Sequence, residues 1–267
     1  DFSDLILKGG SDGIRKIWIL DNLFNSKPLA GKKILPNGCF NLAFIFGQGL
    51  TFHVRDQSYK IKEGVYLCGQ FSSQISVEIE AHTKVSLAQL YPWTLSLFGD
   101  ASQEAHKDRL LPLEEIIGKS RLRITPAELL CEHCILKYLY ELLSDIGPQT
   151  HIHPFLQEAC LLLKNAQGNL SIQHLSQGLR YSSRFVEKKF KNYVGLSPKE
   201  FSRILRVRSI IDELKLHPQR PHLTDLGLKY GFYDQAHFIK TFRQVLNISP
   251  KEFKAPNYIL PLRGVGF

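Results

Sequence analysis

The 267-residue chain contains no methionine, two tryptophans and only five cysteines. The cysteines are odd in number and far apart, which argues against a disulfide-stabilised secreted domain and favours a reducing compartment. No apolar run approaches the ~20 residues that cross a lipid bilayer. The N-terminus also lacks the basic and then apolar stretch of a secretory signal. We therefore expect a cytoplasmic protein without a membrane partner.

The motifs of several enzyme classes are also missing. The sequence has no glycine-rich phosphate loop, no Gly-Xaa-Ser-Xaa-Gly nucleophile motif and no His-Glu-Xaa-Xaa-His pair. His53 lies among expected strands without the neighbouring His and Glu that a metal-binding β-barrel needs. We therefore expect no catalytic residue, no metal and no cofactor, and the protein is not predicted to be an enzyme.

Acidic residues become scarce towards the C-terminus. Residues 1–150 carry 16 Lys and Arg against 17 Asp and Glu, whereas residues 151–267 carry 18 against 8, so the net charge of +9 belongs to the C-terminal part. The basic residues recur at helical spacing and no basic block adjoins an apolar anchor, which favours nucleic acid over a membrane as the polyanionic partner. A basic but inert surface is the alternative.

Residues 1–100 favour β-structure. Turn clusters such as Pro36-Asn37-Gly38 separate short runs of β-branched and aromatic residues. The expected strands are 42–46, 50–54, 65–67, 75–79 and 85–90. Several short strands at close spacing are typical of a sandwich or barrel.

Residues 101–147 change to a helical pattern. Leu129, Leu136 and Leu143 recur every seven residues. This leucine seam predicts either a dimer contact or packing against the β-barrel. Gly147-Pro148 breaks the pattern, and we expect a linker over 148–153.

Two cysteines lie three residues apart in this helical segment. Cys131 and Cys134 would share one face of a helix and flank its apolar stripe. The favoured interpretation is that they are small core residues. The alternative is a metal or redox site that His151 or His153 would complete.

The C-terminal part contains an internal repeat. The segment Ser-Pro-Lys-Glu-Phe at 197–201 recurs unchanged at 249–253, which is 52 residues later. Ser182 matches Asp234 at the same offset of 52 residues. Before the turn that precedes these two residues the offset is 51, so the turn of the second copy is one residue longer. Each copy predicts a short helix, a tight turn and a second helix with Ser182 or Asp234 as its N-cap. Such a helix-turn-helix can place its second helix in a major groove.

The repeated five-residue segment has the pattern of a helix start. Serine is the N-cap, proline takes the first helical position, and glutamate three residues later closes a capping box. After the first copy we expect a long helix over 198–215. This helix would hold the two units at a fixed separation.

Residues 154–254 resemble the DNA-binding domain of AraC-type bacterial transcriptional regulators. The typical second-copy signature stands here as Gly231-Phe232, a polar helix with Phe238 and Phe242, and Ser249-Pro250. The resemblance implies that two recognition helices insert into adjacent major-groove segments of double-stranded DNA. It implies base-reading roles for Arg184, Glu187, Lys188, Gln235, Ala236, His237 and Lys240. The expected phosphate contacts are Ser183, Lys191, Lys199, Arg203, Arg206 and Lys251.

Two residues depart from the family pattern. Arg180 stands in the first turn where the family usually has glycine, which predicts a strained or reshaped turn. Gly227 stands where a helical alanine is usual, which costs up to ~1 kcal/mol of helix stability. Neither change removes a base-reading residue.

Residues 30–100 resemble, more weakly, the cupin-like regulatory domain of some of these regulators, through 35–42 and 89–93. We therefore expect an α+β fold. It consists of a β-rich cupin-like barrel over 1–100, a helical connector over 101–147 and an all-α domain over 154–256, in which a long helix joins two helix-turn-helix units. The resemblance adds a small-molecule effector, RNA polymerase and a second copy of the chain as expected partners.

Two alternative functions remain open at this point. The N-terminal part could be an enzyme or small-molecule carrier that the basic domain only localises to DNA, or the chain could be a non-specific architectural DNA binder. The polar faces of the two expected recognition helices differ, which favours sequence-specific reading over both alternatives.

Overall fold

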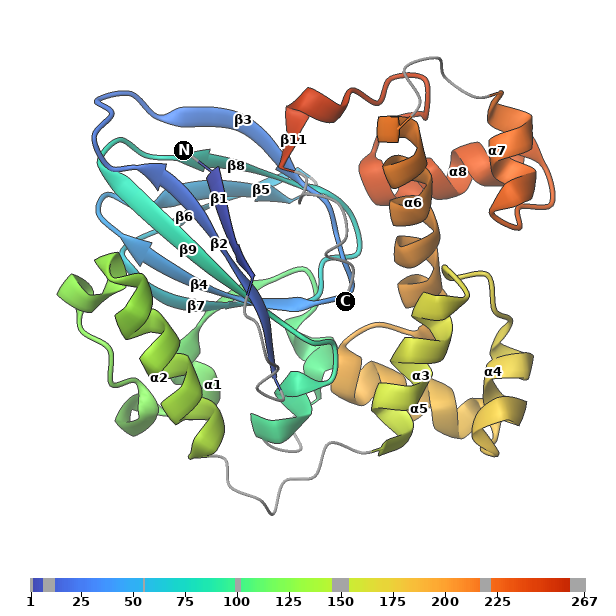
Figure 1. The fold of residues 1–267 in the computed structure, drawn as a ribbon, viewed down its shortest axis with the longest axis horizontal. Helices are drawn as coiled ribbons and strands as arrows, with labels where there is room; N and C mark the ends of the chain where they lie inside the picture. The colour runs from blue at the N-terminus through green and yellow to red at the C-terminus, as the bar shows by residue number, and fades with distance from the viewer. Residues whose placement is uncertain are drawn as a thin grey trace.

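The computed structural model describes residues 2–6, 13–54, 56–98, 102–145, 154–216 and 222–259. Two β-sheets and the helices that cover them form the N-terminal part, and a group of α-helices forms the C-terminal part (Figure 1). The expected α+β architecture is confirmed. The linker predicted over 148–153, with His151 and His153, lies outside the described residues.

The β-barrel consists of two sheets. The six-stranded sheet has the order β1-β2-β9-β4-β7-β10 and the five-stranded sheet the order β11-β3-β8-β5-β6. Their strands are β1 (Phe2–Ile6), β2 (Ile14–Asn22), β3 (Leu29–Ile34), β4 (Phe40–Phe46), β5 (Leu50–Val54), β6 (Gln57–Ile61), β7 (Gly64–Cys68), β8 (Ile75–Ile79), β9 (Thr83–Leu90), β10 (Leu110–Pro112) and β11 (Tyr258–Ile259). The five runs predicted from the sequence are strands, but β1, β2, β3, β6, β10 and β11 are not among those predictions.

The burial of each strand depends on whether one or both of its faces pack against a core. Strands β5 and β8 alternate between buried and half-buried residues, which is the pattern of a strand with one face on a core. Strand β4 is almost wholly buried because its alternate side chains enter different cores. Ala43 and Ile45 face the other sheet, whereas Leu42 and Phe44 belong to a core shared with helices.

Helix α2 (Glu132–Ser144) covers the outer face of the six-stranded sheet, together with α1 (Leu113–Ile117) and η4 (Pro126–Leu130). The leucine seam belongs to this contact. Leu129 is buried in the shared core, and Leu136 and Leu143 pack against it. The seam therefore packs against the barrel, which is the second of its two predicted roles. The remaining short elements here are η1 (Thr94–Phe98), η2 (Gln103–His106) and η3 (Lys119–Arg121).

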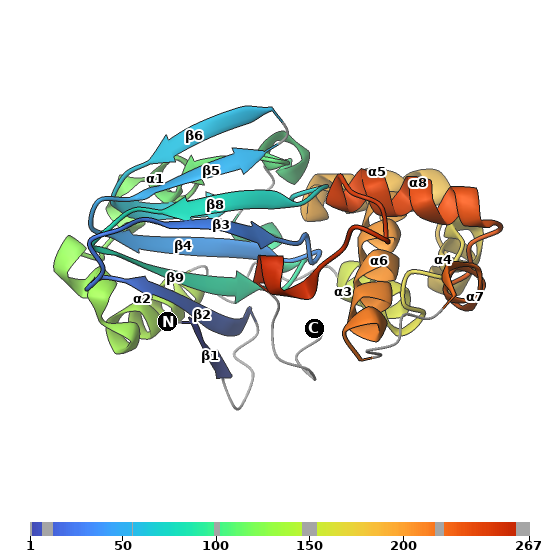
Figure 2. The ribbon, with the colours of Figure 1, turned by 90° about the horizontal axis from the view of Figure 1, so that it is seen from above.

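The C-terminal helices are α3 (Pro154–Asn165), α4 (Ile172–Leu179), α5 (Ser183–Val194), α6 (Pro198–Leu216), α7 (Leu223–Lys229) and α8 (Gln235–Leu246). Together they bury two aromatic cores, one around Phe190 and Phe201 and the other around Phe238 and Phe242. Both α5 and α8 lie on the same side of this part in the view of Figure 2. None of the helices among the described residues is long and apolar enough to cross a membrane.

The two copies of the repeated segment have different structures. At 197–201 the capping box forms, because Ser197 N donates to Glu200 Oε2 at 2.9 Å and Glu200 N donates to Ser197 Oγ at 3.2 Å. At 249–253 Ser249 N also donates to Glu252 Oε2, at 2.7 Å, but only a turn follows. The interpretation of the second copy as a helix start is therefore wrong. Its Phe253 packs on Phe242 instead and directs the chain back towards the barrel.

The chain after α8 joins the N-terminal sheet. Beyond η5 (Ala255–Asn257), β11 pairs in parallel with β3, where Tyr258 stands opposite Lys33. Tyr258 is buried, and its hydroxyl donates to Gln74 Oε1 at 3.0 Å. Sequence patterns do not predict this strand, because a pair of residues carries no periodicity.

Candidate nucleic-acid interface

The first helix-turn-helix unit, residues 172–194, consists of α4 and α5. Ser182 is the N-cap of α5, and its Oγ accepts a hydrogen bond from Phe185 N at 3.3 Å. Val186 and Phe190, one helical turn apart, are fully buried. The three predicted base-reading residues of this unit, Arg184, Glu187 and Lys188, are all exposed on the other side of α5.

The second unit, residues 223–246, repeats this design with α7 and α8. Asp234 is the N-cap of α8, and its Oδ1 accepts from His237 N at 2.6 Å. Phe238 and Phe242 fill the core. The four predicted base-reading residues Gln235, Ala236, His237 and Lys240 are exposed. Both N-caps predicted from the sequence are confirmed.

The turn of the second unit is one residue longer than the turn of the first unit, as the change of offset in the repeat predicted. Each turn has one residue in the left-handed region, Arg180 (φ 58°) in the first and Gly231 (φ 71°) in the second. Arg180 precedes its N-cap by two residues, and Gly231 precedes its own by three. The inserted residue therefore lies between the left-handed position and the N-cap, where Phe232 and Tyr233 take the place of Tyr181 alone.

Helix α6 joins the two units by entering both cores. Phe201 and Ile204 pack in the core of the first unit, whereas Val207, Ile210 and Ile211 pack in the core of the second. Because one continuous helix supplies buried residues to both units, it fixes their separation and orientation. This is the role that the sequence predicted for the long helix.

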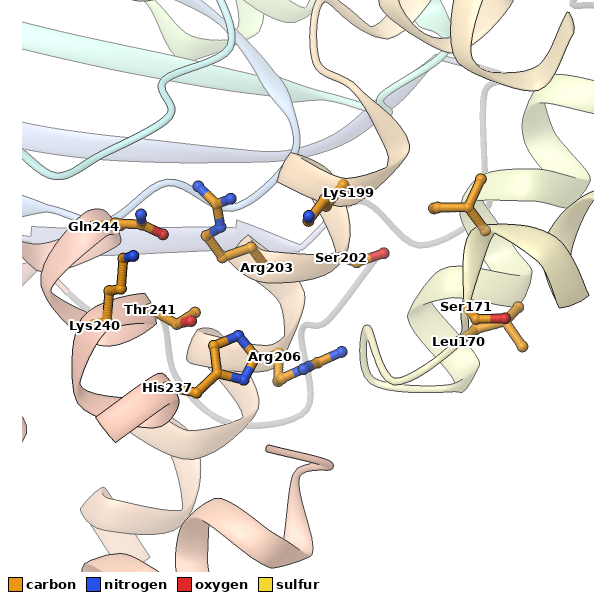
Figure 3. Close-up of a pocket in the computed structure, with 11 residues that line it drawn as sticks. Leu170, Ser171, Lys199, Ser202, Arg203, Arg206, His237, Lys240, Thr241 and Gln244 are labelled. Carbon is orange, nitrogen blue, oxygen red and sulfur yellow. The ribbon is translucent and has the colours of Figure 1, made fainter. Parts of the chain in front are cut away.

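A basic cleft of about 530 Å³ lies between α6 and α8 (Figure 3). Lys199, Arg203 and Arg206 line it from α6, and His237 and Lys240 line it from α8. The start of α4 closes one side with Leu170, Ser171 and Ile172. None of the described residues that line the cleft is acidic. The cleft therefore concentrates positive charge beside the second recognition helix, where a phosphate backbone would be attracted.

Arg206 has contacts within the protein at the junction of the two units. Its Nη2 donates to the carbonyl oxygen of Gly168 at 2.9 Å, and its Nη1 reaches the carbonyl oxygen of Gly231 at 3.5 Å. Its guanidinium carbon also lies 4.9 Å from the centre of the Phe232 ring. Burial lowers the pKa of Arg206. This side chain connects the loop before α4 with the turn before α8.

The other predicted phosphate contacts are spread over the surface. Lys199 and Arg203 line the basic cleft, whereas Lys251 is exposed in the turn after α8. Ser183 Oγ lies 3.0 Å from Ser176 Oγ at the turn of the first unit. Lys191 lies near the C-terminal end of α5, where its Nζ is 3.7 Å from Glu104 Oε1 of η2.

Contacts with η2 connect the N-terminal part to the first unit. Besides the Lys191–Glu104 pair, Lys107 Nζ forms an ion pair with Glu200 Oε1 at 2.5 Å. Burial opposes ionisation of Glu200, but the Lys107 ammonium and the Ser197 N–H and hydroxyl prevail and lower its pKa. Gly195, at the end of α5, packs so closely that a Cβ there would lie 2.8 Å from the Gln103 carbonyl oxygen. The N-terminal part therefore contacts a recognition helix directly, through η2.

Sequence reasoning missed several residues of this surface. Thr241 and Gln244 of α8 line the basic cleft, and Tyr233 is 90% exposed directly before the N-cap of α8. Tyr181, before the N-cap of α5, stacks on Phe185 with ring centres 4.6 Å apart. The internal repeat could have revealed Tyr181 and Tyr233, because a tyrosine directly precedes the N-cap in both copies. No group of three or more His, Cys, Asp or Glu in the described residues is arranged to hold a metal ion.

Comparisons with known proteins identify the class of this domain. A family model described as a helix-turn-helix domain matches residues 175–255. Over 104 residues the chain is 28% identical to the multiple antibiotic resistance protein MarA of Salmonella typhimurium, covering 37% of this chain and 80% of that protein. The chain covers only 30% of the regulator ArgR of Pseudomonas aeruginosa and 11% of a Staphylococcus aureus regulator.

The chain is also similar to solved structures. The chain is 30% identical to a Chromobacterium violaceum regulator with an AraC-type DNA-binding domain, covering 39% of this chain and 92% of that one, with a TM-score of 0.34. ToxT of Vibrio cholerae is 14% identical with a TM-score of 0.46, and the match covers 88% of this chain and 95% of that one. The chain belongs to the AraC-type family of DNA-binding transcriptional regulators.

Proposed function

We propose that this protein regulates transcription by reading duplex DNA with α5 and α8 in adjacent major-groove segments. The observation that supports the proposal is the placement of α5 and α8 on one side of α6, each with its polar face exposed, and with α8 lining the basic cleft. Arg184 and Lys188 would donate to guanine, Glu187 would accept from cytosine and Gln235 would pair with adenine. Lys199 and Arg203 would hold the phosphate backbone between the two grooves.

In vitro selection of random duplex DNA by the full chain tests this proposal. We expect a selected site with two short conserved segments about one helical turn apart, since that spacing presents both grooves to one face of the protein. A single segment, or no enrichment over random DNA, would contradict it. The number and spacing of sites per bound protein also measure self-association, and so test the predicted homodimer. Addition of RNA polymerase to the complex with the selected DNA tests whether the polymerase also binds, as the resemblance predicts.

We also propose that the N-terminal part modulates DNA binding through η2. Glu104 neutralises Lys191, a predicted phosphate contact, and about half of each side chain is solvent-exposed. Substitution Glu104→Gln should therefore raise DNA affinity about two- to fivefold at low salt, within the about 0–1 kcal/mol of an exposed ion pair. The matched control is Glu115→Gln, an exposed carboxylate on α1. Equal effects of the two substitutions would contradict a specific role for η2.

A small-molecule effector would have its place inside the barrel. Two adjacent cavities of about 50 and 40 Å³ lie there, and both are lined by Ile34, Cys68, Ile75 and Leu87. These volumes suffice for water but are far below the ~300 Å³ of typical ligand pockets. An effector would therefore have to widen these cavities. We propose that it does so by moving β3, which pairs with β11 and precedes Leu35 in the core of the second unit.

Thermal unfolding of the full chain with metabolite mixtures tests the effector proposal. A binding compound should raise the unfolding temperature of the unmodified chain. The variant Ala43→Leu fills the smaller cavity and should lose this response. A response that survives in Ala43→Leu would place the effector elsewhere, and no response to any mixture would contradict the proposal.

A further inference from the structure

Cys131 and Cys134 lie where η4 meets α2. Cys131 is the N-cap residue of α2, with φ −96° and ψ 110°, and Cys134 belongs to the first helical turn. The Cys134 N–H donates to Cys131 Sγ at 3.3 Å. The sulfur thus takes the place of the serine or aspartate oxygen that usually accepts from this N–H at a helix start. The structure therefore brings the two thiols together and directs helix N–H groups at one of them.

Hydrogen bonds divide the two thiols into an acidic and a weakly acidic member. The pKa of Cys131 is lowered, first by the hydrogen bond from the Cys134 thiol and then by the Cys134 N–H, whereas partial desolvation and the charge of Glu128 oppose this effect. The pKa of Cys134 is raised, mainly because its proton is held by Cys131. The thiolate, which is the nucleophile in thiol–disulfide exchange, therefore forms at Cys131 before Cys134.

The other three cysteines have a different environment. Cys39, Cys68 and Cys160 are 3%, 6% and 0% exposed, and all three are free thiols. Burial raises the pKa of each, for Cys68 to about 12. Cys131 and Cys134 are half-buried and reachable from solvent. Within one chain, three cysteines thus serve as internal controls for the accessible pair.

We propose that Cys131 and Cys134 form a thiol–disulfide redox site whose oxidant is a low-molecular-weight disulfide. The Cys131 thiolate attacks one sulfur of the oxidant, which forms a mixed disulfide and releases one thiolate. Cys134 then loses its proton and attacks the Cys131 sulfur, which forms the 131–134 disulfide and releases a second thiolate. The protein loses two electrons and two protons, and the oxidant is reduced to two thiols.

The surrounding structure is compatible with both redox states. Leu129 and Ile135 on either side of the pair remain in the core shared by α2 and the barrel. Lys84 Nζ holds the same junction by donating to the Leu130 carbonyl oxygen at 3.1 Å and by pairing with Glu132 Oε1 at 3.4 Å. We expect the bond between the two sulfurs to form by side-chain rotation at the first turn of α2, where the two residues already lie within hydrogen-bonding reach of each other. Oxidation is therefore expected to be reversible without unfolding of the barrel.

Titration of the full chain with reduced and oxidised glutathione tests the proposal, read by alkylation of remaining thiols and mass spectrometry of peptides. We expect the unmodified chain to lose two hydrogens and to yield a 131–134 linked peptide. Cys134→Ser should stop at a glutathione adduct on Cys131. Cys131→Ser, which keeps a good N-cap residue, should react at least about tenfold more slowly, and Cys160→Ser should behave like the unmodified chain.

Three results would overturn the proposal. The first is a persistent glutathione adduct on the unmodified chain, which would show that Cys134 does not resolve it. The second is alkylation of Cys39, Cys68 or Cys160 at the rate of Cys131 in the folded protein. The third is the absence of any 131–134 disulfide even in pure oxidised glutathione.

Discussion

The two helix-turn-helix units have the same caps and the same spacing of buried side chains, but they differ in their turns and in their neighbours. The first unit turns through Arg180 and touches η2 of the barrel at Lys191. The second turns through Gly231 and lines the basic cleft with His237 and Lys240. The two copies therefore share the N-cap and the buried side chains that hold the second helix of each unit in place. The surroundings of the two copies differ, and we propose that regulation acts on the first copy and that phosphate attraction is centred on the second.

The largest expected effect concerns the cores. Phe190→Ala and Phe238→Ala each remove a fully buried ring and should lower the free energy of unfolding by about 3–5 kcal/mol. Because α6 enters both cores, either substitution should destabilise both units together. Denaturant unfolding followed by near-ultraviolet circular dichroism measures this. Separate transitions for the two units would show that α6 does not couple them.

The next largest effect concerns DNA affinity and distinguishes the two recognition helices by the base pair that each contacts. Arg184→Ala and Gln235→Ala should each weaken binding to the selected DNA by about 1–3 kcal/mol and relax preference at a different base pair. Binding isotherms on single-base variants of the site measure both effects. The control is Gln157→Ala, which removes an exposed side chain of the same type from α3. Equal losses on selected and random DNA would contradict base reading.

A smaller effect distinguishes two roles for Arg206. The sequence predicts a phosphate contact, whereas the structure shows bonds to the Gly168 and Gly231 carbonyls. We expect Arg206→Ala to lower affinity on all sequences without changing the salt dependence, since the loss acts through the junction of the units. Arg203→Ala, in the same cleft, should reduce the slope of log K against log salt by about 0.9. A similar reduction for Arg206→Ala would establish a phosphate contact instead.

The smallest effect tests the turns. Arg180→Gly should stabilise the chain by up to about 1 kcal/mol, because glycine adopts a left-handed φ without the steric cost of a side chain. Gly231→Ala should destabilise it, because φ is 71° and a Cβ would lie 2.0 Å from Asn169 Oδ1. Thermal unfolding of both variants measures the difference. A neutral Gly231→Ala would show that this close approach relaxes freely.

Most of the helical part could be predicted because its signals are local. The N-caps Ser182 and Asp234, the capping box at Ser197 and the spacing of buried Phe residues each act within one or two helical turns. The repeat then supports each signal by a second example. The identical segment at 249–253 led to a wrong prediction of a helix, because a capping pattern is only one of the signals that a helix needs. No apolar face continues after Phe253, so the capping residues there have no helix to begin.

The barrel was predicted less completely. Strand β3 was missed, and its partner β8 comes from a distant part of the chain. Strand β6 was also missed, although it follows its partner β5 directly, because its residues are mostly exposed and no apolar pattern marks them. The leucine seam allowed two interpretations until the fold showed which apolar surface lay opposite. The prediction that Cys131 and Cys134 are small core residues was wrong, because both are half-buried. Cys131 is the N-cap of α2, and this placement, which separates the acidities of the two thiols, depends on where α2 begins.

Local sequence patterns are enough to specify a C-terminal part that is a duplicated DNA-binding unit with positive charge on its outer faces. Helix caps, helical periodicity and net charge are properties of neighbouring residues, and they survive in any compact arrangement. Only the packed fold places α5 and α8 on one side, pairs Lys191 with Glu104 and returns the chain to the barrel through β11. These contacts join residues that are far apart in the sequence. They depend on which surfaces the close-packed cores bring together, and no local pattern contains that information.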